Sequence, residues 1–440
     1  MSRYTSVTED DLREMLATIG VASVDELFAD VPSGLRLGRP LALEAGLSEQ
    51  EVYAELQALA SRNISAEDEI TFLGAGMYDS YVPALVDSII TRSEFLTPYT
   101  PYQPEVSQGG LQAMFEYQTA ISELTGLPVS NASVYEGPSA VAAAGYLAKL
   151  HNGRRRFVVS AGVHPHAIET LTTLARGWEM EVEVVELVDA ATDLAGAGLA
   201  EDVSAVVLQQ PNFLGAVEHL EPLVQAAHDV GALVICSADP ISLGLLQAPG
   251  AQGVDIVVGE GQTLGNHLDF GGPSFGFFAV TDELVRRLPG RIAGRTHDLE
   301  GRLGYVLTLQ TREQHIRRER ATSNICTAQA LNALAGIVYL SWLGRRGMVE
   351  LAELLVQRTA YARARLDALT GVALSHNKPV FREFPIRIFG DVDRAIEHCL
   401  TNGINPGYRI SDNELLVAIT EQRTRADIDR LADTLEEALT

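Results

Sequence analysis

Residues 203–239 read VSAVVLQQPNFLGAVEHLEPLVQAAHDVGALVICSAD, which is an apolar run, an amphipathic stretch and a second apolar run. The apolar runs are continuous, as in strands that are buried on both faces, and the stretch between them has helical spacing. The pattern extends outward to further apolar runs at 156–163, 181–188, 255–261 and 275–281. Strands separated by helices predict an α/β domain with a large parallel or mixed sheet covered on both faces.

Two regions with different patterns flank this domain. Residues 1–65 show helical apolar spacing, and Ser48 with Glu51 resembles a capping box that opens a helix. Residues 325–440 look mainly helical but contain FREFPIRIF, GINPGYRI and NELLVAIT, which indicate two or three strands. We therefore expect an N-terminal helical arm over 1–65, a large α/β domain over 66–324 and a smaller C-terminal α+β domain over 325–440.

Charge and composition exclude several classes of function. The 58 acidic and 33 basic residues give a net charge of −25, which disfavours nucleic acids and anionic membranes as partners. The acidic start lacks a signal-peptide core, and no apolar run approaches the roughly 20 residues of a membrane span, so we expect a cytoplasmic protein. Three cysteines lie far apart without a CxxC or Cys/His cluster. We expect reduced thiols and no metal site.

Lysine is rare in this chain. The 33 basic residues comprise 31 arginines and two lysines, Lys149 and Lys378. Lys149 falls on an alanine-rich predicted helix and Lys378 in a predicted turn, so we expect both to be solvated surface residues. Chemistry that needs a reactive amine has only these two candidates.

The predicted sheet also predicts where a ligand would bind. In an open α/β sheet, the ligand crevice lies outside the carboxyl ends of the strands. His164 and His166 follow one such strand, but a pair without a third ligand favours a structural or stacking role over a metal site. The loops that follow the apolar runs are residues 162–166, 209–215, 237–242 and 259–266.

The proline-rich segment, residues 96–107 (LTPYTPYQPEVS), is the most unusual stretch of the chain. Its prolines forbid a helix and disfavour a central strand, so it forms a stiff, extended chain with aromatic and polar side chains. Composition alone favours a rigid loop packed on its own domain. The alternative is an arm that reaches into an active site or a partner.

Two further motifs carry weaker signals. Gly137 and Pro138 precede an alanine-rich helix whose first N–H groups could hold an anion, with a tightly packed small-residue helix as an equal alternative. Residues 312–320, REQHIRRER, indicate a salt-bridged helix face or an anion or subunit contact. No GxGxxG or P-loop pattern occurs, which disfavours a nucleotide-binding dehydrogenase.

Several long motifs resemble one family. They are TFLGAGMYDSYVP, TPYTPYQPEVSQG, ADPISLGLL, VVGEGQTLGNHLDFGGPSFGFFA and LTLQTREQHIRRERATSNICT, together with LREMLATIGVASVDELF near the start. They are similar to the glycine cleavage system P-protein, the glycine decarboxylase, over essentially the whole chain. The resemblance implies a fold-type I pyridoxal-phosphate transferase fold. It also implies that this chain is the separate first half, the α subunit (subunit 1), paired with a β subunit (subunit 2) in an α2β2 assembly.

The resemblance further implies how a cofactor would be held. In this fold type, an aspartate at a strand end pairs with the pyridine nitrogen, and a lysine some twenty-odd residues later forms a Schiff base. Asp239 matches the aspartate, and His164 is a second candidate contact. The position that matches the lysine is Gln262, whose amide is not nucleophilic. Pyridoxal 5'-phosphate is therefore expected to be bound covalently by the partner β subunit.

The implied reaction is decarboxylation of glycine, with release of CO2 and transfer of the aminomethyl group to the lipoyl arm of H-protein. This chain is expected to complete a shared active site. A self-sufficient pyridoxal decarboxylase or aminotransferase is an alternative that Gln262 argues against, and a non-catalytic scaffold or regulatory subunit is another. The candidate contacts to the shared site lie on the proline-rich segment: Tyr99, Thr100, Tyr102, Gln103 and Glu105.

Overall fold

The computed structural model describes residues 6–323, 325 and 328–439, so Cys326 lies outside the described part. The chain divides into two compact units, residues 1–63 and residues 64–440. In the first unit, α1 (Glu9–Ile19) and α2 (Glu49–Ala60) confirm two of the expected helices, and each begins at a capping box. None of the described residues of this unit is buried.

The region between these helices differs from the helix expected there. It forms only short 3-10 turns, at Val24–Phe28 and Ser33–Leu35, and no regular structure up to α2. The physical reason lies in the sequence VPSGLRLGRP, residues 31–40, where two prolines and two glycines prevent continued helical hydrogen bonding.

The second unit is built on a seven-stranded sheet with the order β2-β10-β9-β8-β7-β3-β4. The strands from β9 to β4 run parallel, and β10 pairs antiparallel with both β9 and β2, so the sheet is mixed. All six predicted runs form strands in it. The bounds are β2 Val129–Ser130, β3 Arg156–Ser160, β4 Glu181–Val185, β7 Val203–Gln210, β8 Leu233–Ala238, β9 Ile256–Glu260 and β10 Gly276–Val280.

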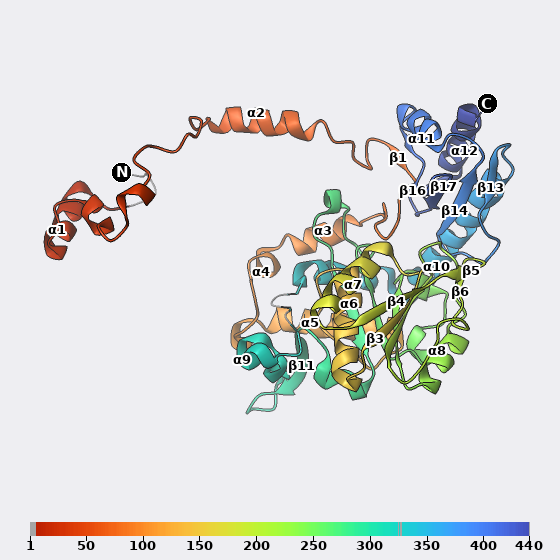
Figure 1. Ribbon diagram of the computed structural model, residues 1–440, viewed down its shortest axis with the longest axis horizontal. Helices are drawn as coiled ribbons and strands as arrows, with labels where there is room; N and C mark the ends of the chain where they lie inside the picture. Colours follow the sequence, from red (N-terminus) through yellow and green to blue (C-terminus); the bar gives the residue numbers. More distant parts are fainter. Residues whose placement is uncertain (1–5, 324, 326–327, 440) are drawn as a thin grey trace. The chain divides into compact units, whose positions relative to one another are not determined.

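Except at the edge strand β4, both faces of this sheet are buried, which explains the continuous apolar runs. Alternate side chains point to opposite faces, so Val158 and Val206 join one core while Val159 and Val207 join the other. Three helices cover the first face, α5 (Gln108–Thr125), α8 (Leu220–Asp229) and α10 (Ala330–Asp367). Two helices cover the second face, α6 (Gly137–Asn152) and α7 (Pro165–Gly177), and Figure 1 shows this pair beside β3 and β4.

A smaller antiparallel sheet with the order β13-β14-β17-β16 forms near the C-terminus, as expected. With the helices that cover it, this sheet gathers at one end of the second unit, drawn in blue in Figure 1. Its elements are β13 Val372–Leu374, β14 Glu383–Ile388, α11 Val392–Thr401, β16 Tyr408–Ser411, β17 Glu414–Ala418 and α12 Arg425–Leu439.

The chain passes between the two sheets more than once. β1 (Ile70–Thr71) pairs with β15 (Ile404–Asn405), and the fully buried Phe72 belongs to the C-terminal core. α10 contributes Ala333 to the core of the large sheet and Leu366 to the C-terminal core. The domain boundaries after residues 65 and 324 therefore stay predictions.

Smaller elements complete the second unit. Two antiparallel hairpins, β5–β6 (Leu187–Val188, Ala191–Thr192) and β11–β12 (Ile292–His297, Leu303–Thr308), were not expected from the sequence. Cys236 and Cys399 are buried and free, as expected. Within the described residues, no helix has the length and apolar content that crossing a membrane requires.

Candidate functional site

The loops that follow the parallel strands meet around one crevice at the carboxyl edge of the large sheet, as predicted. The crevice is a cavity of about 440 Å³. Its wall also includes residues 73–78, which precede α3 (Ala84–Ile90), and residues 381–383 at the start of β14. The crevice therefore lies between the large sheet and the C-terminal sheet. The lining residues that matter below are Tyr78, Gly137, His164, Asp239, Glu260, Arg382 and Glu383.

Asp239, directly after β8, is already paired within the chain. The Nε atom of Arg382 lies 2.7 Å from Asp239 Oδ2, and Ile241 N–H donates to Asp239 Oδ1 at 3.0 Å. The Arg382 guanidinium lies 3.6 Å from the centre of the Tyr78 ring, and Arg382 is 3% exposed. Burial disfavours the cation, yet the pKa of Arg382 is raised because Asp239, Tyr78 and Glu383 outweigh that effect. Removing either partner would leave a buried, uncompensated charge.

Glu383 joins the 73–81 loop to the C-terminal sheet. Its Oε1 accepts a hydrogen bond from Ala75 N–H at 2.7 Å, and its Oε2 accepts one from the Tyr78 hydroxyl at 2.8 Å. Burial raises the pKa of Glu383 to about 7, although these hydrogen bonds and Arg382 favour the carboxylate. A Cβ atom at Gly74 would lie 2.4 Å from Glu383 Oε1, so only glycine allows this approach.

Two carboxylates fill the N-terminus of α6. Gly137 N–H donates to Glu260 Oε2 at 2.9 Å, and Ser139 N–H donates to Glu136 Oε1 at 3.0 Å. Pro138, between them, has no N–H to offer. Burial raises the pKa of Glu260 to about 7, partly offset by the hydrogen bonds that it accepts. The donors that could have held an external anion are therefore used by the chain itself.

Gln262, at the position that the resemblance assigns to a lysine, binds backbone. It is 1% exposed, and its Oε1 accepts from Tyr78 N–H at 3.0 Å. Its Nε2 donates to Tyr78 O at 3.1 Å and to Asn266 O at 2.9 Å. Both ends of the amide are occupied, so Gln262 ties the 73–81 loop to the turn after β9.

His164 lines the crevice as a neutral ring. Its Nε2 lies 2.8 Å from Ala75 O, and its Nδ1 accepts from His166 N–H at 3.1 Å. Burial lowers the pKa of His164. The ring meets Phe213 edge-on at 5.0 Å, which agrees with the expected stacking role. No group of three or more potential metal ligands occurs among the described residues.

These contacts do not suit pyridoxal phosphate. That cofactor needs an amine for the imine, a carboxylate for its pyridine nitrogen and donors for its phosphate. Here Gln262 offers no nucleophile, Asp239 is paired with Arg382, and the α6 N–H groups are bonded to carboxylates. A phosphate there would face like charges, which repel by about 4 kcal/mol per unit pair at 4 Å and an effective dielectric constant of 20.

The proline-rich segment lies outside the crevice lining. It ends in a 3-10 turn at Pro104–Val106 that leads into α5, and part of it lines a second hollow of about 310 Å³ beside α5 and the start of α10. Tyr99 is 84% exposed and Tyr102 is 54% exposed. Gln103 and Glu105 are exposed and Thr100 is half-buried.

Tyr102 anchors this segment to the body of the second unit. Its hydroxyl accepts a hydrogen bond from Arg291 Nη2 at 3.2 Å, and the Arg291 guanidinium lies 5.4 Å from the ring centre. The ring also meets His315 edge-on at 6.0 Å. The segment is thus anchored through Tyr102, while the Tyr99 side chain is exposed to solvent.

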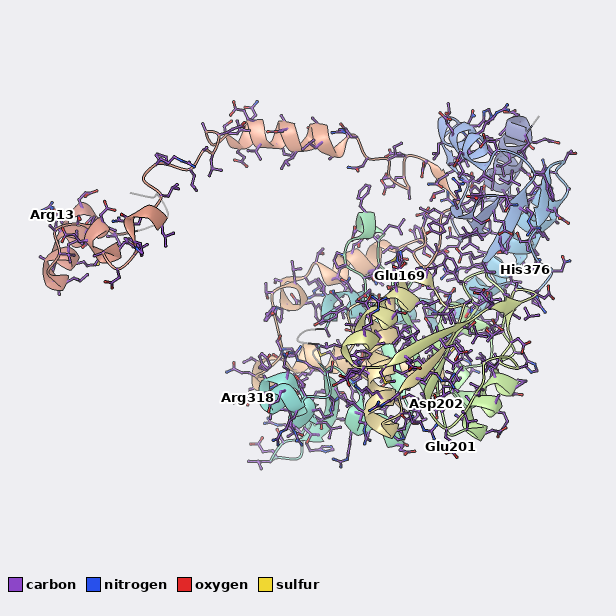
Figure 2. All side chains as sticks on the ribbon, viewed as in Figure 1. Arg13, Glu169, Glu201, Asp202, Arg318 and His376 are labelled. Atoms are coloured by element: carbon purple, nitrogen blue, oxygen red, sulfur yellow. The ribbon has the colours of Figure 1, made fainter. Side chains whose placement is uncertain are left out.

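The 312–320 motif does not form the salt-bridged helix face that its charge pattern suggested. A single helical turn, α9 (Gln314–Arg317), lies between two 3-10 turns. Arg312 is buried and donates to the carbonyl oxygens of Leu288 and Gly290. Arg317 and Arg318 are exposed, and Arg318 is labelled in Figure 2.

Neither lysine lines the crevice. Each is half-buried with its amine at a polar partner, which is compatible with the expected surface position. Lys149 Nζ donates to Trp178 O at 2.6 Å, and Lys378 Nζ lies 3.0 Å from Asp189 Oδ2. Alkyl stems that pack against the surface while the amine reaches a polar partner explain this partial burial.

Sequence reasoning missed four residues of the crevice, Tyr78, Glu260, Arg382 and Glu383. The sequence signal that could have found two of them is the adjacent charges of Arg382 and Glu383 at the start of the apolar strand in FREFPIRIF. Tyr78 lies in the quoted motif TFLGAGMYDSYVP, after glycines that permit a close approach. Their convergence depends on contacts between residues about 300 positions apart, such as Tyr78 and Glu383 at a separation of 305.

Comparisons with known proteins agree along the whole chain. The family model described as glycine cleavage system P-protein matches residues 2–435. A probable glycine dehydrogenase (decarboxylating) subunit 1 from Geotalea uraniireducens is 49% identical, covering 99% of this chain and 100% of the relative. Its counterpart from Geobacillus kaustophilus is 46% identical and covers 99% of both chains. A crystal structure of inhibitor-bound glycine decarboxylase (P-protein) has a TM-score of 0.91 at 43% identity over 100% of both chains. A sphingosine-1-phosphate lyase structure, with 14% identity and a TM-score of 0.63 over 93% of this chain and 94% of its own, shares the fold of pyridoxal-phosphate enzymes.

Proposed function

This chain belongs to the glycine cleavage system P-protein family, and we propose that it is the α-type subunit (subunit 1) of a two-subunit glycine decarboxylase. The observation that carries this proposal is the match with relatives that are named subunit 1, which covers 99–100% of each chain. Their name supports a partner β subunit (subunit 2), and we propose an α2β2 assembly.

The proposed reaction of this assembly is decarboxylation of glycine, with release of CO2 and transfer of the aminomethyl group to the lipoyl arm of H-protein. Pyridoxal phosphate, when bound, supplies the electron sink for loss of the carboxylate. We place that cofactor on a lysine of the partner subunit. The support is the crevice of this chain, whose lining includes neither Lys149 nor Lys378. A cytoplasmic location stays a prediction.

We propose that the proline-rich segment is this chain's contribution to the shared site. Tyr99, Gln103 and Glu105 present polar groups to solvent, and the anchored Tyr102 holds the segment in one conformation. A rigid element that carries exposed polar groups can orient a substrate without losing much conformational entropy on binding.

Expression with and without the partner subunit tests the proposal. Glycine-dependent exchange of CO2 in the presence of H-protein is expected only from the pair, together with pyridoxal-phosphate absorbance. Each chain alone and the pair without glycine serve as controls. Activity from this chain alone would overturn the proposal.

A further inference from the structure

Besides the lack of a lysine, two further contacts in the crevice disfavour binding of pyridoxal phosphate. Arg382 neutralises Asp239 at 2.7 Å, where a pyridine nitrogen would need a carboxylate. Glu260 accepts from Gly137 N–H at 2.9 Å, where a phosphate would need a donor. Glu260 lies on the same loop as Gln262 and accepts a hydrogen bond from Gln262 N–H at 3.0 Å, whereas Asp239 and Arg382 lie on two other segments. The Arg382–Asp239 pair is therefore a feature separate from the loss of the lysine.

The same groups connect the two sheets. Tyr78 is held by Gln262 on the large-sheet side and by Glu383 on the C-terminal side. Further along the 73–81 loop, Tyr81 N–H donates to Glu421 at 2.7 Å, and Arg423 lies 2.7 Å from Asp79. The loop is therefore bonded to both sheets.

A close backbone approach supports this connection from the opposite wall. A Cβ atom at Gly215, whose φ is +77°, would lie 1.7 Å from Glu383 O. Val217 N–H donates to Pro379 O at 2.9 Å, and His376 Nε2 lies 3.0 Å from Leu214 O (His376 is labelled in Figure 2). The loop after β7 thus touches the segment that leads into β14 through backbone contacts and through the His376 side chain.

We propose that this crevice is a clamp between the two sheets, closed to pyridoxal phosphate by its own charges as well as by Gln262. Arg382 occupies the Asp239 carboxylate that a cofactor would need, and together with the Tyr78–Glu383 pair it fixes the C-terminal sheet against the large sheet. Restoring a lysine at position 262 is then not sufficient to restore cofactor binding. This inference rests on the proposed function only for the choice of cofactor.

The first experiment uses the purified full chain, pyridoxal phosphate and borohydride. A lysine amine adds to the cofactor aldehyde, water leaves, and hydride from borohydride reduces the imine to a stable secondary amine. Mass spectrometry of peptides then locates the adduct. Because the native chain has only two lysines, Lys149 and Lys378, beside its terminal α-amine, the background is simple, and the unmodified chain defines it. No partner subunit is needed, so the result is independent of whether the glycine reaction is confirmed.

For Gln262→Lys alone, we expect no adduct at position 262 above the level at Lys149 and Lys378. For Gln262→Lys combined with Glu260→Gln and Arg382→Met, we expect at least a tenfold rise in the adduct at that position. Circular dichroism verifies that both variants are folded. A stoichiometric adduct in the single variant would overturn the proposal, and so would a folded triple variant without an adduct.

Calorimetry of the full chain tests the clamp itself. We expect Arg382→Met to divide the main unfolding transition of residues 64–440 into two, because the two sheets lose their shared charges. Arg156→Met is the matched control, since Arg156 Nε lies 2.9 Å from Asp202 Oδ2 within the large-sheet half (Asp202 is labelled in Figure 2). The control is expected to lower the transition without dividing it. An undivided transition in Arg382→Met, shifted no more than in the control, would contradict the clamp.

Discussion

The crevice and the proline-rich segment differ in whether their polar groups are bonded within the chain or exposed to solvent. In the crevice, Asp239, Glu260 and Gln262 are all bonded to other groups of the chain. In the proline-rich segment, Tyr99 projects into solvent with 84% of its surface exposed. The crevice has the position of an active site with the contacts of a structural core, whereas the segment has the exposure of a binding surface. Location in the fold therefore does not identify where this chain meets a substrate.

The largest expected effect tests the structural half of this comparison. Arg382→Met should lower the free energy of unfolding by about 3–5 kcal/mol, because Asp239, whose side chain is only 14% exposed, loses its partner. Chemical denaturation of the full chain measures it. Arg346→Met, in an exposed pair with Glu350 on α10, should change it by less than about 1 kcal/mol. Equal effects in the two variants would mean that the crevice pair is not structural.

A second prediction uses the pH dependence of the crevice. The pKa of Glu260 is raised from 4.5 to about 7, so the folded chain binds its proton more tightly than the unfolded chain. The free energy of unfolding therefore falls as pH rises through that window, by about 3 kcal/mol from this group. Glu260→Gln removes this titrating carboxyl group. The free energy of unfolding of the variant should therefore rise relative to that of the native chain as the pH increases from 4.5 to 7.

Denaturation at several pH values measures this difference. Glu169→Gln, an exposed change on α7 (labelled in Figure 2), is the matched control and should follow the native chain throughout. Glu136 also faces Glu260 and adds to the rise of its pKa, so Glu136→Gln should weaken the pH dependence without abolishing it. A constant difference between Glu260→Gln and the native chain would show that Glu260 is not buried as a proton-binding group.

Much of the fold was predictable because burial leaves a local signal. The continuous apolar runs predicted β3, β7, β8 and β9, since a strand covered on both faces needs apolar side chains at every position. The edge strand β4 was predicted from its alternating sequence EVEVV. The β11–β12 hairpin was missed because RIAGRTHDLEGRLGYVLT mixes charges and glycines without a clear alternation. Local patterns do not report a strand whose side chains are mostly exposed.

The candidate site was predictable only in part, for a related reason. Asp239 and His164 were placed at the crevice because strand ends converge by topology. Arg382 and Glu383 were missed because their pairing with Asp239 and Tyr78 depends on how two sheets pack, which no local pattern encodes. The resemblance directed attention to Gln262, yet only the structure places its amide on the backbone of Tyr78.

A third prediction addresses the exposed half of the comparison. Tyr99→Phe and Tyr102→Phe should each lower turnover of the subunit pair about tenfold, which corresponds to about 1.4 kcal/mol, through loss of one hydroxyl contact. Stability should hardly change in Tyr99→Phe, because that side chain is exposed, whereas Tyr102→Phe also removes the hydrogen bond from Arg291. Tyr408→Phe is the matched control, because Tyr408 lines the crevice and lies outside the proline-rich segment. This variant should leave turnover unchanged. If only Tyr408→Phe lowers turnover, the crevice and not the proline-rich segment contributes to the shared site.

The smallest expected effect concerns the charges near the proline-rich segment. His315 contacts Tyr102, and the exposed Arg317 and Arg318 follow it on α9 and the next turn. If this surface meets the partner subunit, Arg317→Glu with Arg318→Glu should weaken association about threefold to tenfold at low salt, and less at high salt. Co-purification and titration of the two subunits measure the loss. Arg345→Glu with Arg346→Glu, on α10, reverses the same number of exposed charges elsewhere. Equal weakening in both double variants would assign the effect to net charge, whereas weakening at α9 alone would place the segment at the subunit contact.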